Sequence, residues 1–302
     1  MPFNDFGEIL AWLKSNGIAK RAAVAAAHDL DALTSVVAAR HAGILDSILI
    51  GDGDRIRQLL VQLGEDATTW EIVEEIDDAK SARMAAQLTA DNEVDMPMKG
   101  LLQTGTFLRA VLDKKFGMVA EKALISQATI FHYQEEERMV VVSDCAINVA
   151  PDYSKKMQII RNSVELCHAL GIDEPKVAVV APFEHVNPEM QSTVDAAMLT
   201  LANVRGQIKG CIVDGPLGFD TAISIEAVRH KGLVSAVAGH ADVLIMPDLA
   251  AGNILDKSIR YLAKFETAGV VAGAKVPLIM TSRSDSSENK FNSIVMSVLQ
   301  SL

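Results

Sequence analysis

The sequence lacks the features that mark membrane-embedded, exported or disulfide-bonded proteins. Its longest apolar runs, such as residues 22–27 and 177–182, are far shorter than the ~20 residues that cross a bilayer. No charged segment followed by an apolar leader is visible, so we expect a cytoplasmic protein without a membrane span. The cysteines, Cys145, Cys167 and Cys211, are odd in number and lie among apolar residues. That pattern is typical of reduced core thiols rather than of disulfides or a zinc site.

Positive charge is also scarce. The chain has 28 Lys and Arg against 39 Asp and Glu, which gives a net charge of -11. A surface of this charge repels nucleic acid and anionic lipid, so we expect neither as a partner. An anionic ligand must therefore be held by a local cluster of charge. Arginines beside polar loops are for this reason more informative than lysines along helices.

Several common site motifs are missing. The glycines of GDGDRI, residues 51–56, are followed by Ile56 where a dinucleotide-binding loop has a small residue, and the two aspartates would repel a pyrophosphate. The histidines include no pair at the spacing of metal ligands, and no G-x-S-x-G turn is present. We therefore expect no nicotinamide site in this loop, no metal and no bound cofactor.

Apolar residues, by contrast, make up 49% of the chain, enough for a substantial core. Short β-branched segments alternate with longer segments of helical period, which predicts an α/β fold with mostly parallel sheets flanked by helices. The predicted strands cover residues 22–27, 47–50, 125–133, 139–143, 177–182, 210–213, 243–247 and 276–281. The predicted helices cover residues 31–42, 54–63, 79–91, 104–114, 153–170, 193–204, 254–268 and 286–302.

This number of strands is too large for one open sheet of the given length, so two lobes are expected. We place a boundary at FHYQEEER, residues 131–138, which predicts a first lobe of residues 1–138 plus 283–302 and a second of residues 139–282. No linker rich in Pro, Gly or Ser separates them. Because ligands bind beyond the carboxyl ends of strands in such sheets, we expect an active site in a cleft between the lobes.

The stretch LIMTSRSDSSENKF, residues 278–291, passes from a predicted strand into a polar loop and then into the last helix. Free N–H groups at the start of a helix attract anions, and serine hydroxyls can add hydrogen bonds. Arg283 supplies a planar cation that can hold a phosphate through two hydrogen bonds. The segment predicts an oxyanion or phosphate site formed with Ser282, Ser284 and Ser286, although an ordinary serine-rich helix cap is an alternative.

The last helix also offers a carboxylate. Glu288 lies seven residues before Val295, hence at nearly the same angle as the apolar face that is expected to be buried. We expect Glu288 to act as an acid or base. A capping box, in which Asp285 caps the helix and Glu288 reaches back, explains the same residues equally well.

Two further segments are candidates for binding. In residues 96–112, Thr104 and Thr106 are possible hydroxyl caps, and Arg109 lies about one turn into the helix, where a cation is unfavourable unless an anion shares the site. A solvated arginine is the alternative. In PDLAAGN, residues 247–253, a strand-to-helix turn carries Asp248, Gly252 and Asn253, which suit a ligand or a plain Asx turn equally well.

Taken together, KGLLQTGTFLRAVL, SDCAINVAPD, VNPEMQSTVDAAML, VDGPLGFDTAIS, ADVLIMPDLAAGNILDKSIRYLA and TSRSDSSENKF closely resemble the phosphate acetyltransferase and phosphate butyryltransferase family. The similarity is nearer the butyryltransferase branch and runs in order from about residue 20 to the end of the chain. The resemblance implies a two-lobed fold similar to isocitrate and isopropylmalate dehydrogenases, and a homo-oligomer, a dimer or larger. It also implies reversible acyl transfer between coenzyme A and phosphate, with acyl-CoA, phosphate and acyl phosphate as partners.

The resemblance further implies roles for particular residues. A Ser-Arg pair in the cleft of family members corresponds to Ser282 and Arg283, and a helical arginine corresponds to Arg109. Acetyltransferases of the family have an aspartate seven residues after the serine, as a proposed base for the coenzyme thiol. This chain has Asn289 there, and an amide cannot take up a proton at neutral pH. We expect Glu288 to replace it, with Asp285 as second choice.

We expect direct transfer in a ternary complex, because no activated Cys or Ser nucleophile is apparent. Two alternatives remain. A non-catalytic module that binds coenzyme A or acyl phosphate is compatible with Asn289. An NAD-dependent decarboxylating dehydrogenase on the related fold would need clustered aspartates for a metal and a nicotinamide site, and neither is found in the sequence.

Overall fold

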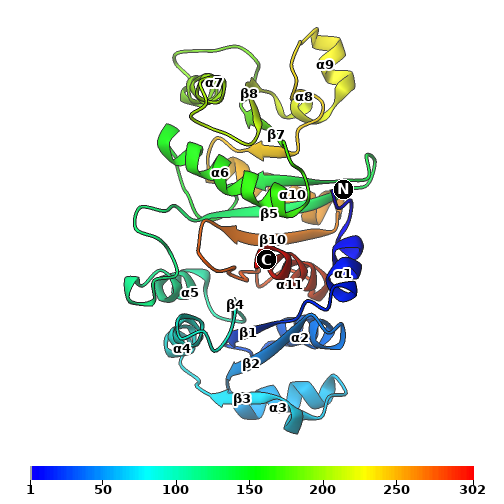
Figure 1. The fold of residues 1–302 in the computed structure, drawn as a ribbon, viewed down its shortest axis with the longest axis vertical. Helices are drawn as coiled ribbons and strands as arrows, with labels where there is room; N and C mark the ends of the chain where they lie inside the picture. Colours follow the sequence, from blue (N-terminus) through cyan, green and yellow to red (C-terminus); the bar gives the residue numbers. More distant parts are fainter. Residues whose placement is uncertain (1) are drawn as a thin grey trace. The chain divides into compact units, whose positions relative to one another are not determined.

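The alternating pattern of the sequence produces two α/β units in a computed structural model that describes residues 2–302 (Figure 1). Unit 1 contains Leu124–Glu266 together with the residues up to Asp5. Unit 2 contains Phe6–Ala123 and Thr267–Leu302. Each unit is therefore assembled from segments that are distant in sequence.

Unit 2 has a parallel sheet in the order β3-β2-β1-β4. Its strands are β1 (Lys20–Ala25), β2 (Leu45–Gly51), β3 (Glu71–Glu74) and β4 (Met96–Lys99). Beyond β4, a parallel bridge joins Met98 to Ile279, and an antiparallel bridge joins Leu278 to Val271 in β10 (Thr267–Ala272). The last segment of the chain thereby extends the first sheet.

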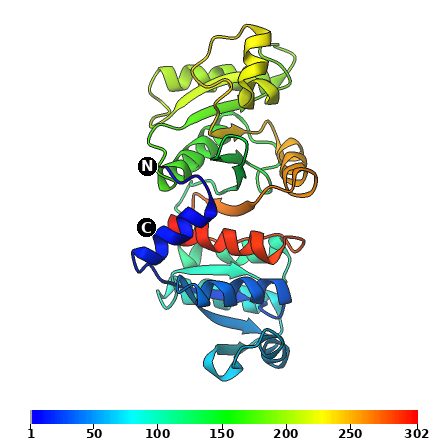
Figure 2. The ribbon, with the colours of Figure 1, turned by 90° about the vertical axis from the view of Figure 1, so that its right-hand side faces the viewer.

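The helices of unit 2 begin where side chains accept the first unpaired N–H groups. Asp29, Asp52 and Asp77 cap α2 (Leu30–His41), α3 (Gly53–Gln62) and α4 (Asp78–Ala90). The other helices are α1 (Phe6–Ser15), α5 (Thr104–Val111), α11 (Ser287–Gln300) and the short 3₁₀ turns Ala67–Thr69 and Lys114–Phe116. Figure 2 shows α11 in red beside α1 and α2 in blue, and α11 also packs on β10.

Unit 1 has strands in the order β5-β6-β9-β7-β8. The strands are β5 (Ser126–Tyr133), β6 (Arg138–Ser143), β7 (Lys176–Val180), β8 (Ile212–Leu217) and β9 (Val243–Ile245). Only the β5–β6 pair is antiparallel among these pairings of the described residues. The helices are α6 (Tyr153–Ala169), α7 (Gln191–Val204), α8 (Phe219–Ile223), α9 (Ile225–Lys231) and α10 (Leu249–Ser258), the last followed by a π turn at Ile259–Ala263.

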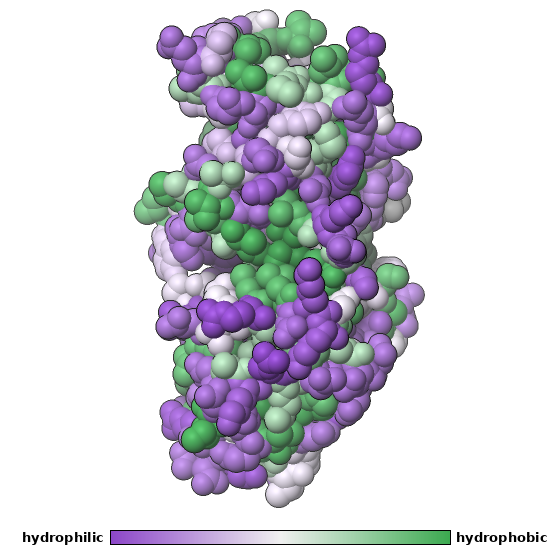
Figure 3. Space-filling view, turned by 90° about the vertical axis from the view of Figure 1, so that its left-hand side faces the viewer, coloured by the Kyte–Doolittle hydropathy of each residue, from purple (hydrophilic) through white to green (hydrophobic). Residues whose placement is uncertain are grey.

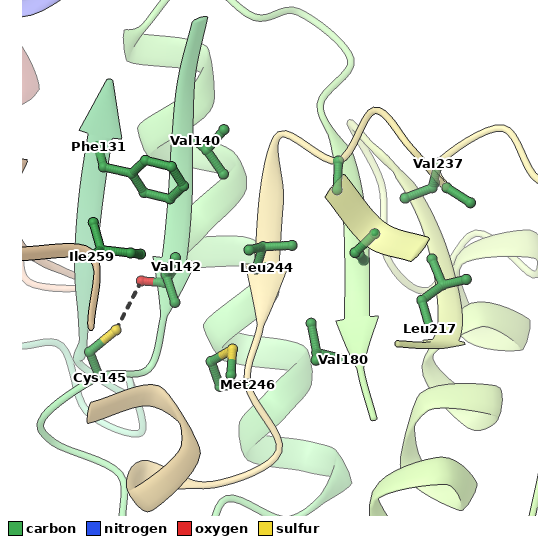
Figure 4. Close-up of a cluster of buried hydrophobic side chains, with 14 of the residues drawn as sticks. Phe131, Val140, Val142, Cys145, Val180, Leu217, Val237, Leu244, Met246 and Ile259 are labelled. Carbon is green, nitrogen blue, oxygen red and sulfur yellow. Dashed lines mark hydrogen bonds between the residues drawn. The ribbon is translucent and has the colours of Figure 1, made fainter. Parts of the chain in front are cut away.

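The core of unit 1 is formed by alternate residues of its strands. Figure 4 shows Phe131, Val142, Leu244 and Val180 from four neighbouring strands, all buried in one cluster. Fully burying such a side chain contributes roughly 1.5–3 kcal/mol. Cys145 belongs to this cluster and donates its Sγ–H to the Val142 carbonyl at 3.3 Å, so it acts as a core residue.

The mixed α/β fold with parallel sheets flanked by helices is confirmed, while several elements differ from the prediction. The predicted helix 254–268 is wrong at its end, because α10 stops at Ser258 and residues from Thr267 form β10. The predicted strand 276–281 is reduced to bridges at Leu278 and Ile279. The strands β3, β4 and β10 and the helices α1, α8 and α9 were not predicted.

The division into units also differs from the predicted lobes, since the units change at residues 123/124 and 266/267 rather than at 138/139 and 282/283. The physical reason is that FHYQEEER is the turn of the β5–β6 hairpin, whose residues Tyr133 and Arg138 pair directly. A hairpin turn has the polar composition of a linker but keeps both of its strands in one sheet.

Hydrophilic and hydrophobic side chains both reach the surface. The face drawn in Figure 3 carries many hydrophilic residues, in purple, together with hydrophobic areas, in green. Between residues 2 and 302, no helix is long and apolar enough to cross a membrane.

Candidate functional site

The strand order of unit 2 defines a place for ligands. The chain moves outward from β1 to β2 and β3, and then returns to the other side of β1 with β4. The direction of the connections therefore reverses between β1 and β4, and open parallel sheets bind ligands at the carboxyl ends of strands at such a point. The loops there are residues 26–29 and 100–103. The segment after Ile279, which runs parallel to β4, places residues 281–286 at the same edge.

The loops after β1 and β4 are in direct backbone contact. Gly100 N donates to Ala25 O at 2.8 Å, and Leu101 N donates to Ala26 O at 3.0 Å. A Cβ on Gly100 would lie 2.3 Å from Ala26 O, so only glycine permits this approach. The base of the site is therefore a rigid main-chain contact.

Lys99, the last residue of β4, is buried behind this contact, with 1% of its surface exposed. Its ammonium donates to Gly100 O at 3.0 Å and to Leu102 O at 3.3 Å. Burial, followed by the positive charges of Arg283 and Lys290, lowers the pKa of Lys99 from 10.5 to about 8. The carboxylates of Asp285 and Asp29 act in the opposite direction. Lys99, Arg283 and Lys290 therefore influence one another at this edge of the sheet.

The turn that contains Ser282 and Arg283 is held from within. Ser282 N donates to the Asp285 carboxylate at 2.8 Å, and Asp285 N donates to Ser282 O at 3.2 Å. Lys290 donates its ammonium to the carbonyl of Asp285 at 2.5 Å. Asp285 and Lys290 are buried, whereas Arg283 is exposed. These hydrogen bonds thus fix the main chain of the turn, and the Arg283 side chain is exposed to solvent.

The start of α11 differs from the predicted capping box. The N-cap is Ser286, whose Oγ accepts from Asn289 N at 3.2 Å, so the prediction that Asp285 caps this helix is wrong. The expectation that Glu288 extends the buried face is also wrong, because Glu288 is exposed. Asn289 uses its side-chain oxygen to accept from Thr267 N at 3.2 Å. The amide thereby links the start of α11 to the first residue of β10.

Helix α5 brings Arg109 to a different position from the one expected. The helix ends at Val111, so Arg109 lies in its last turn, where a cation complements the dipole. Arg109 is therefore not electrostatically misplaced, and the expectation from the sequence is wrong on this point. The cap residue Gln103 makes no side-chain cap hydrogen bond, and Thr104 and Thr106 lie in the first turn rather than at the cap.

Neither candidate arginine forms a salt bridge within the described residues. Arg109 and Arg283 are exposed, and neither has a carboxylate oxygen within 4.0 Å in the range 2–302. Ser282 and Ser284 place their hydroxyl oxygens 3.1 Å apart on the same turn as Arg283. The turn at residues 282–286 and the uncapped start of α5 are thus the donor-rich parts of this edge.

The three candidate residues of unit 1 have structural contacts. Asp248 caps α10 by accepting from Ala251 N at 2.9 Å. A Cβ on Gly252 would lie 2.1 Å from Asp144 O, and Asn253 donates to Cys145 O at 3.2 Å. These contacts fix α10 against the loop after β6, as the Asx-turn alternative requires.

Asp248 also lines a cavity of about 820 Å³ in unit 1. The first turns of α6, α7 and α10 surround it, with Asp152, Gln191 and Asp248 among the lining residues. A buried ion pair of Lys156 and Asp195, 2.7 Å apart, forms part of its wall. Lys156 is therefore already neutralised by a carboxylate.

Other chemistry finds little support in the structure. Burial raises the pKa of the Cys145 and Cys167 thiols, and raises that of Cys211 to about 11. These cysteines are thus protonated at neutral pH and are poor nucleophiles. In the part of the chain that the structure describes, no cluster of His, Cys, Asp or Glu could hold a metal ion.

Sequence reasoning missed Lys99 and Lys290. The position of Lys290 four residues before Ile294 and eight before Val298 places it on the buried face of α11. That spacing could have identified it. The burial of Lys99 carries no comparable signal, since lysines are almost never fully buried unless they are paired.

Comparison with known proteins gives consistent matches. A profile of the family described as "Phosphate acetyl/butaryl transferase" matches residues 53–298. The chain is 42% identical over 295 residues to the phosphate butyryltransferase of Clostridium acetobutylicum, covering 98% of this chain and 97% of that protein. It is 37% identical over 287 residues to the phosphate acetyltransferase of Thermotoga maritima, covering 94% and 96% respectively.

A solved structure is also similar. The crystal structure of a branched-chain phosphotransacylase from Enterococcus faecalis V583 superposes with a TM-score of 0.82 and 30% sequence identity. The superposition covers 93% of this chain and 99% of the other. The similarity therefore extends over both units and includes the segments that carry the candidate residues.

Proposed function

Since the chain belongs to the phosphate acetyltransferase and phosphate butyryltransferase family, it transfers an acyl group reversibly between coenzyme A and phosphate, and we propose that phosphate binds at the carboxyl edge of unit 2. The observation that carries this proposal is the group of three cations in which the buried Lys99 is under the influence of the charges of Arg283 and Lys290. In a protein with a net charge of -11, such a local excess of positive charge favours an anion.

The reaction needs stabilisation of negative charge. In one direction a phosphate oxygen attacks the thioester carbonyl carbon, the carbonyl oxygen becomes an oxyanion, and the C–S bond then breaks to release the coenzyme thiolate. The thiolate takes up a proton, and in the reverse direction the thiol must lose one. Donors aimed at the oxyanion lower the barrier, and each is typically worth ~3 kcal/mol.

We assign the charged contacts to Arg283 and Arg109 and a hydroxyl donor to Ser282. Support comes from the exposure of both guanidinium groups, which lack ion pairs within residues 2–302, and from the fixed turn at Ser282. Thr104, Thr106, Ser284 and Ser286 are proposed as further phosphate donors. Direct transfer in a ternary complex is supported by the raised pKa of the three cysteines, which removes them as nucleophiles.

For the proton acceptor on the thiol we propose Glu288. The Asp285 carboxylate is buried and already accepts Ser282 N–H, whereas the Glu288 carboxylate is exposed at the first turn of α11. The amide of Asn289 is engaged with Thr267 N. The sequence suggested that Glu288 lies on the buried face of α11. The role of Glu288 as proton acceptor is supported instead by the exposure of its carboxylate at the edge of the site.

Further parts of the proposal rest on resemblance. The identities of 41–42% to two clostridial phosphate butyryltransferases support a short-chain acyl group of the butyryl type. A homo-oligomer, a cytoplasmic location, the absence of a bound cofactor or metal, and the dehydrogenase-like arrangement of the lobes with a cleft stay predictions. So do roles of Asp248, Gly252 and Asn253 in binding the substrate.

The test measures phosphate-dependent release of thiol from acetyl-, propionyl-, butyryl- and isobutyryl-coenzyme A. We expect turnover with at least one of these, with no requirement for added NAD or metal, and a preference for four-carbon groups. A sample without phosphate is the control. Binding of the acyl-CoA panel without turnover would contradict the proposal and favour a non-catalytic binding module.

A further inference from the structure

Lys99 and Lys290 share an unusual environment. Both side chains are buried, with 1% and 3% of their surface exposed. Their ammonium groups donate to main-chain carbonyls, and neither has a carboxylate oxygen within 4.0 Å in the described range of the chain. A buried ammonium is costly unless an opposite charge compensates it. The two lysines therefore differ from Lys156, which has its own buried carboxylate.

Each lysine holds one of the turns at the edge of the sheet. Lys99 binds the carbonyls of Gly100 and Leu102, in the turn that leads into α5. Lys290 binds the carbonyl of Asp285, in the turn whose carboxylate holds Ser282 N. The two ammonium groups thus fix the main-chain conformation of the turns that carry the proposed phosphate donors.

The charges of these residues also oppose one another. Lys99 is repelled by Arg283 and by Lys290, and Lys290 lies in the first turn of α11, where the helix dipole disfavours a cation. The nearby carboxylates of Asp285 and Asp29 offset only part of this repulsion. A multiply charged anion beside Arg283 would relieve the repulsion among all three cations.

We propose that Lys99 and Lys290 are positioning residues of the phosphate site, which hold its two turns in place and supply buried positive charge that favours a dianionic phosphate group. Neither side chain touches the ligand. The inference rests on the proposed function for the identity of the anion and for the location of its site. Beyond the proposed function, the two lysines are assigned an indirect effect on the ligand, through the main chain that they hold and through the electrostatic potential of their positive charges.

Inorganic phosphate is the probe for a binding test that requires no turnover. Thermal unfolding is measured with and without phosphate, at constant ionic strength set by chloride, for the wild type, Lys99→Met, Lys290→Met and the control Lys14→Met. Lys14 is an exposed lysine of the same unit. We expect the phosphate-induced rise in Tm to fall by at least half in both Lys99→Met and Lys290→Met, and to be unchanged in Lys14→Met. A full rise in either variant would overturn the role of that lysine.

A second measurement uses the wild type alone and does not depend on the folding of variants. The pKa of about 8 for Lys99 means that its charge is lost between pH 7.5 and 9.5. The charged groups that influence it are Arg283, Lys290, Asp285 and Asp29. Because phosphate becomes more negative over this range, ionisation of the ligand would strengthen binding. We expect the phosphate-induced rise in Tm to shrink instead, and a constant or larger rise contradicts the proposal.

Kinetics separate this inference from the proposed function. For Lys99→Met we expect the KM for phosphate to rise about tenfold, which corresponds to ~1.4 kcal/mol, with a much smaller change in kcat. A purely structural role would lower the amount of active enzyme and leave KM unchanged. If phosphate binding depends on the lysines but no acyl transfer occurs, the function fails and the inference stands. If acyl transfer occurs and the KM for phosphate is the same in the wild type and the lysine variants, the function stands and the inference fails.

Discussion

Exposure divides the side chains of residues 282–290 into two groups. Arg283 and Glu288 are exposed, whereas Asp285 and Lys290 are buried and hydrogen-bond to main-chain groups. Buried polar groups with main-chain partners determine local structure, and exposed charges beside them are accessible to ligands. Substitutions in the two groups should therefore affect different properties.

Arg283→Ala should lose activity and keep its stability. The guanidinium is exposed and makes no ion pair in the described chain, so its removal should change the free energy of unfolding by less than about 0.5 kcal/mol. Loss of a donor to the developing oxyanion should lower kcat/KM by about 100-fold or more. Turnover and denaturant unfolding are measured together, with the exposed Arg55→Ala as matched control. Equal loss of folding and activity would indicate a structural role for Arg283.

Glu288→Gln and Asp285→Asn should separate proton transfer from turn structure. Glu288→Gln should lower kcat without a change in Tm, because the side chain is exposed. Asp285→Asn should lower the free energy of unfolding by roughly 1–2 kcal/mol, because a neutral amide accepts less strongly from Ser282 N and no longer compensates the nearby cations. A greater loss of kcat in folded Asp285→Asn than in Glu288→Gln would reverse the assignment of the base.

At the scale of secondary structure elements, the approach of the β1 and β4 loops depends on one glycine. Gly100→Ala would place a methyl group 2.3 Å from Ala26 O and should destabilise unit 2 by more than about 3 kcal/mol, as severe overpacking does. Gly105→Ala, in α5, meets no atom within 4 Å and should stabilise by up to ~1 kcal/mol. Denaturant unfolding of both variants tests the contrast, and similar effects would argue against the close contact.

Asn289 links two elements, α11 and β10. Removal of its oxygen in Asn289→Ala leaves Thr267 N–H, which lies on a fully buried residue, without its acceptor and should cost about 1–3 kcal/mol. Asn289→Asp keeps an oxygen acceptor and serves as the matched control. Unfolding free energies are compared, and an Asn289→Ala variant as stable as Asn289→Asp would show that the contact contributes nothing.

The elements that sequence patterns predicted well are those in which local and tertiary preferences agree. Helices α3, α4 and α6 combine apolar periodicity with aspartate caps, and the helices occupy the expected segments. The sheet strands β3, β4 and β10 were missed for physical reasons. EIVE is four residues long with charged ends, MPMK contains a proline and a lysine, and TAGVVA follows directly on a helical pattern. Their pairing partners, distant in sequence, make them strands.

The residues of the candidate site also divide into those that local sequence patterns indicate and those whose position depends on distant contacts. Ser282 and Arg283 were chosen as candidates because family resemblance and an anion-binding pattern point to the same loop, and their role stays a prediction. Glu288 was assigned to the wrong face of α11, because the helical wheel was continued into its first turn, where the helix end is open to solvent. Lys99 was missed because its position depends on contacts between β4 and segments that lie far away in the chain. Periodicity does not report such contacts.

For the molecule as a whole, Lys99 links stability to pH. Its pKa is about 8 when folded and near 10.5 when unfolded. Well below pH 8, at about pH 7 and lower, both states are largely protonated and the cost of the buried charge is present almost in full. Between pH 8 and 10.5 the unfolded state binds more protons, so this group makes the protein more stable as pH rises. The difference corresponds to roughly 3 kcal/mol at most.

This contribution is measurable as a difference between two proteins. The unfolding free energy of the wild type minus that of Lys99→Met should increase by about 1–3 kcal/mol from pH 7.5 to 10. Groups that titrate in both proteins cancel in the subtraction. A pH-independent difference would mean that the ammonium of Lys99 does not pay a desolvation penalty in the folded state.

The interleaving of the two units has a consequence for biosynthesis. Unit 2 needs Thr267–Leu302, including α11, whereas nearly all of unit 1 lies between Leu124 and Glu266. During translation, the residues of unit 1 are therefore synthesised before the part of unit 2 that contains Ser282 and Arg283. Since domains generally fold as units while they are synthesised, a nascent chain can form the turn of residues 282–286 only after the residues of unit 1 have been made.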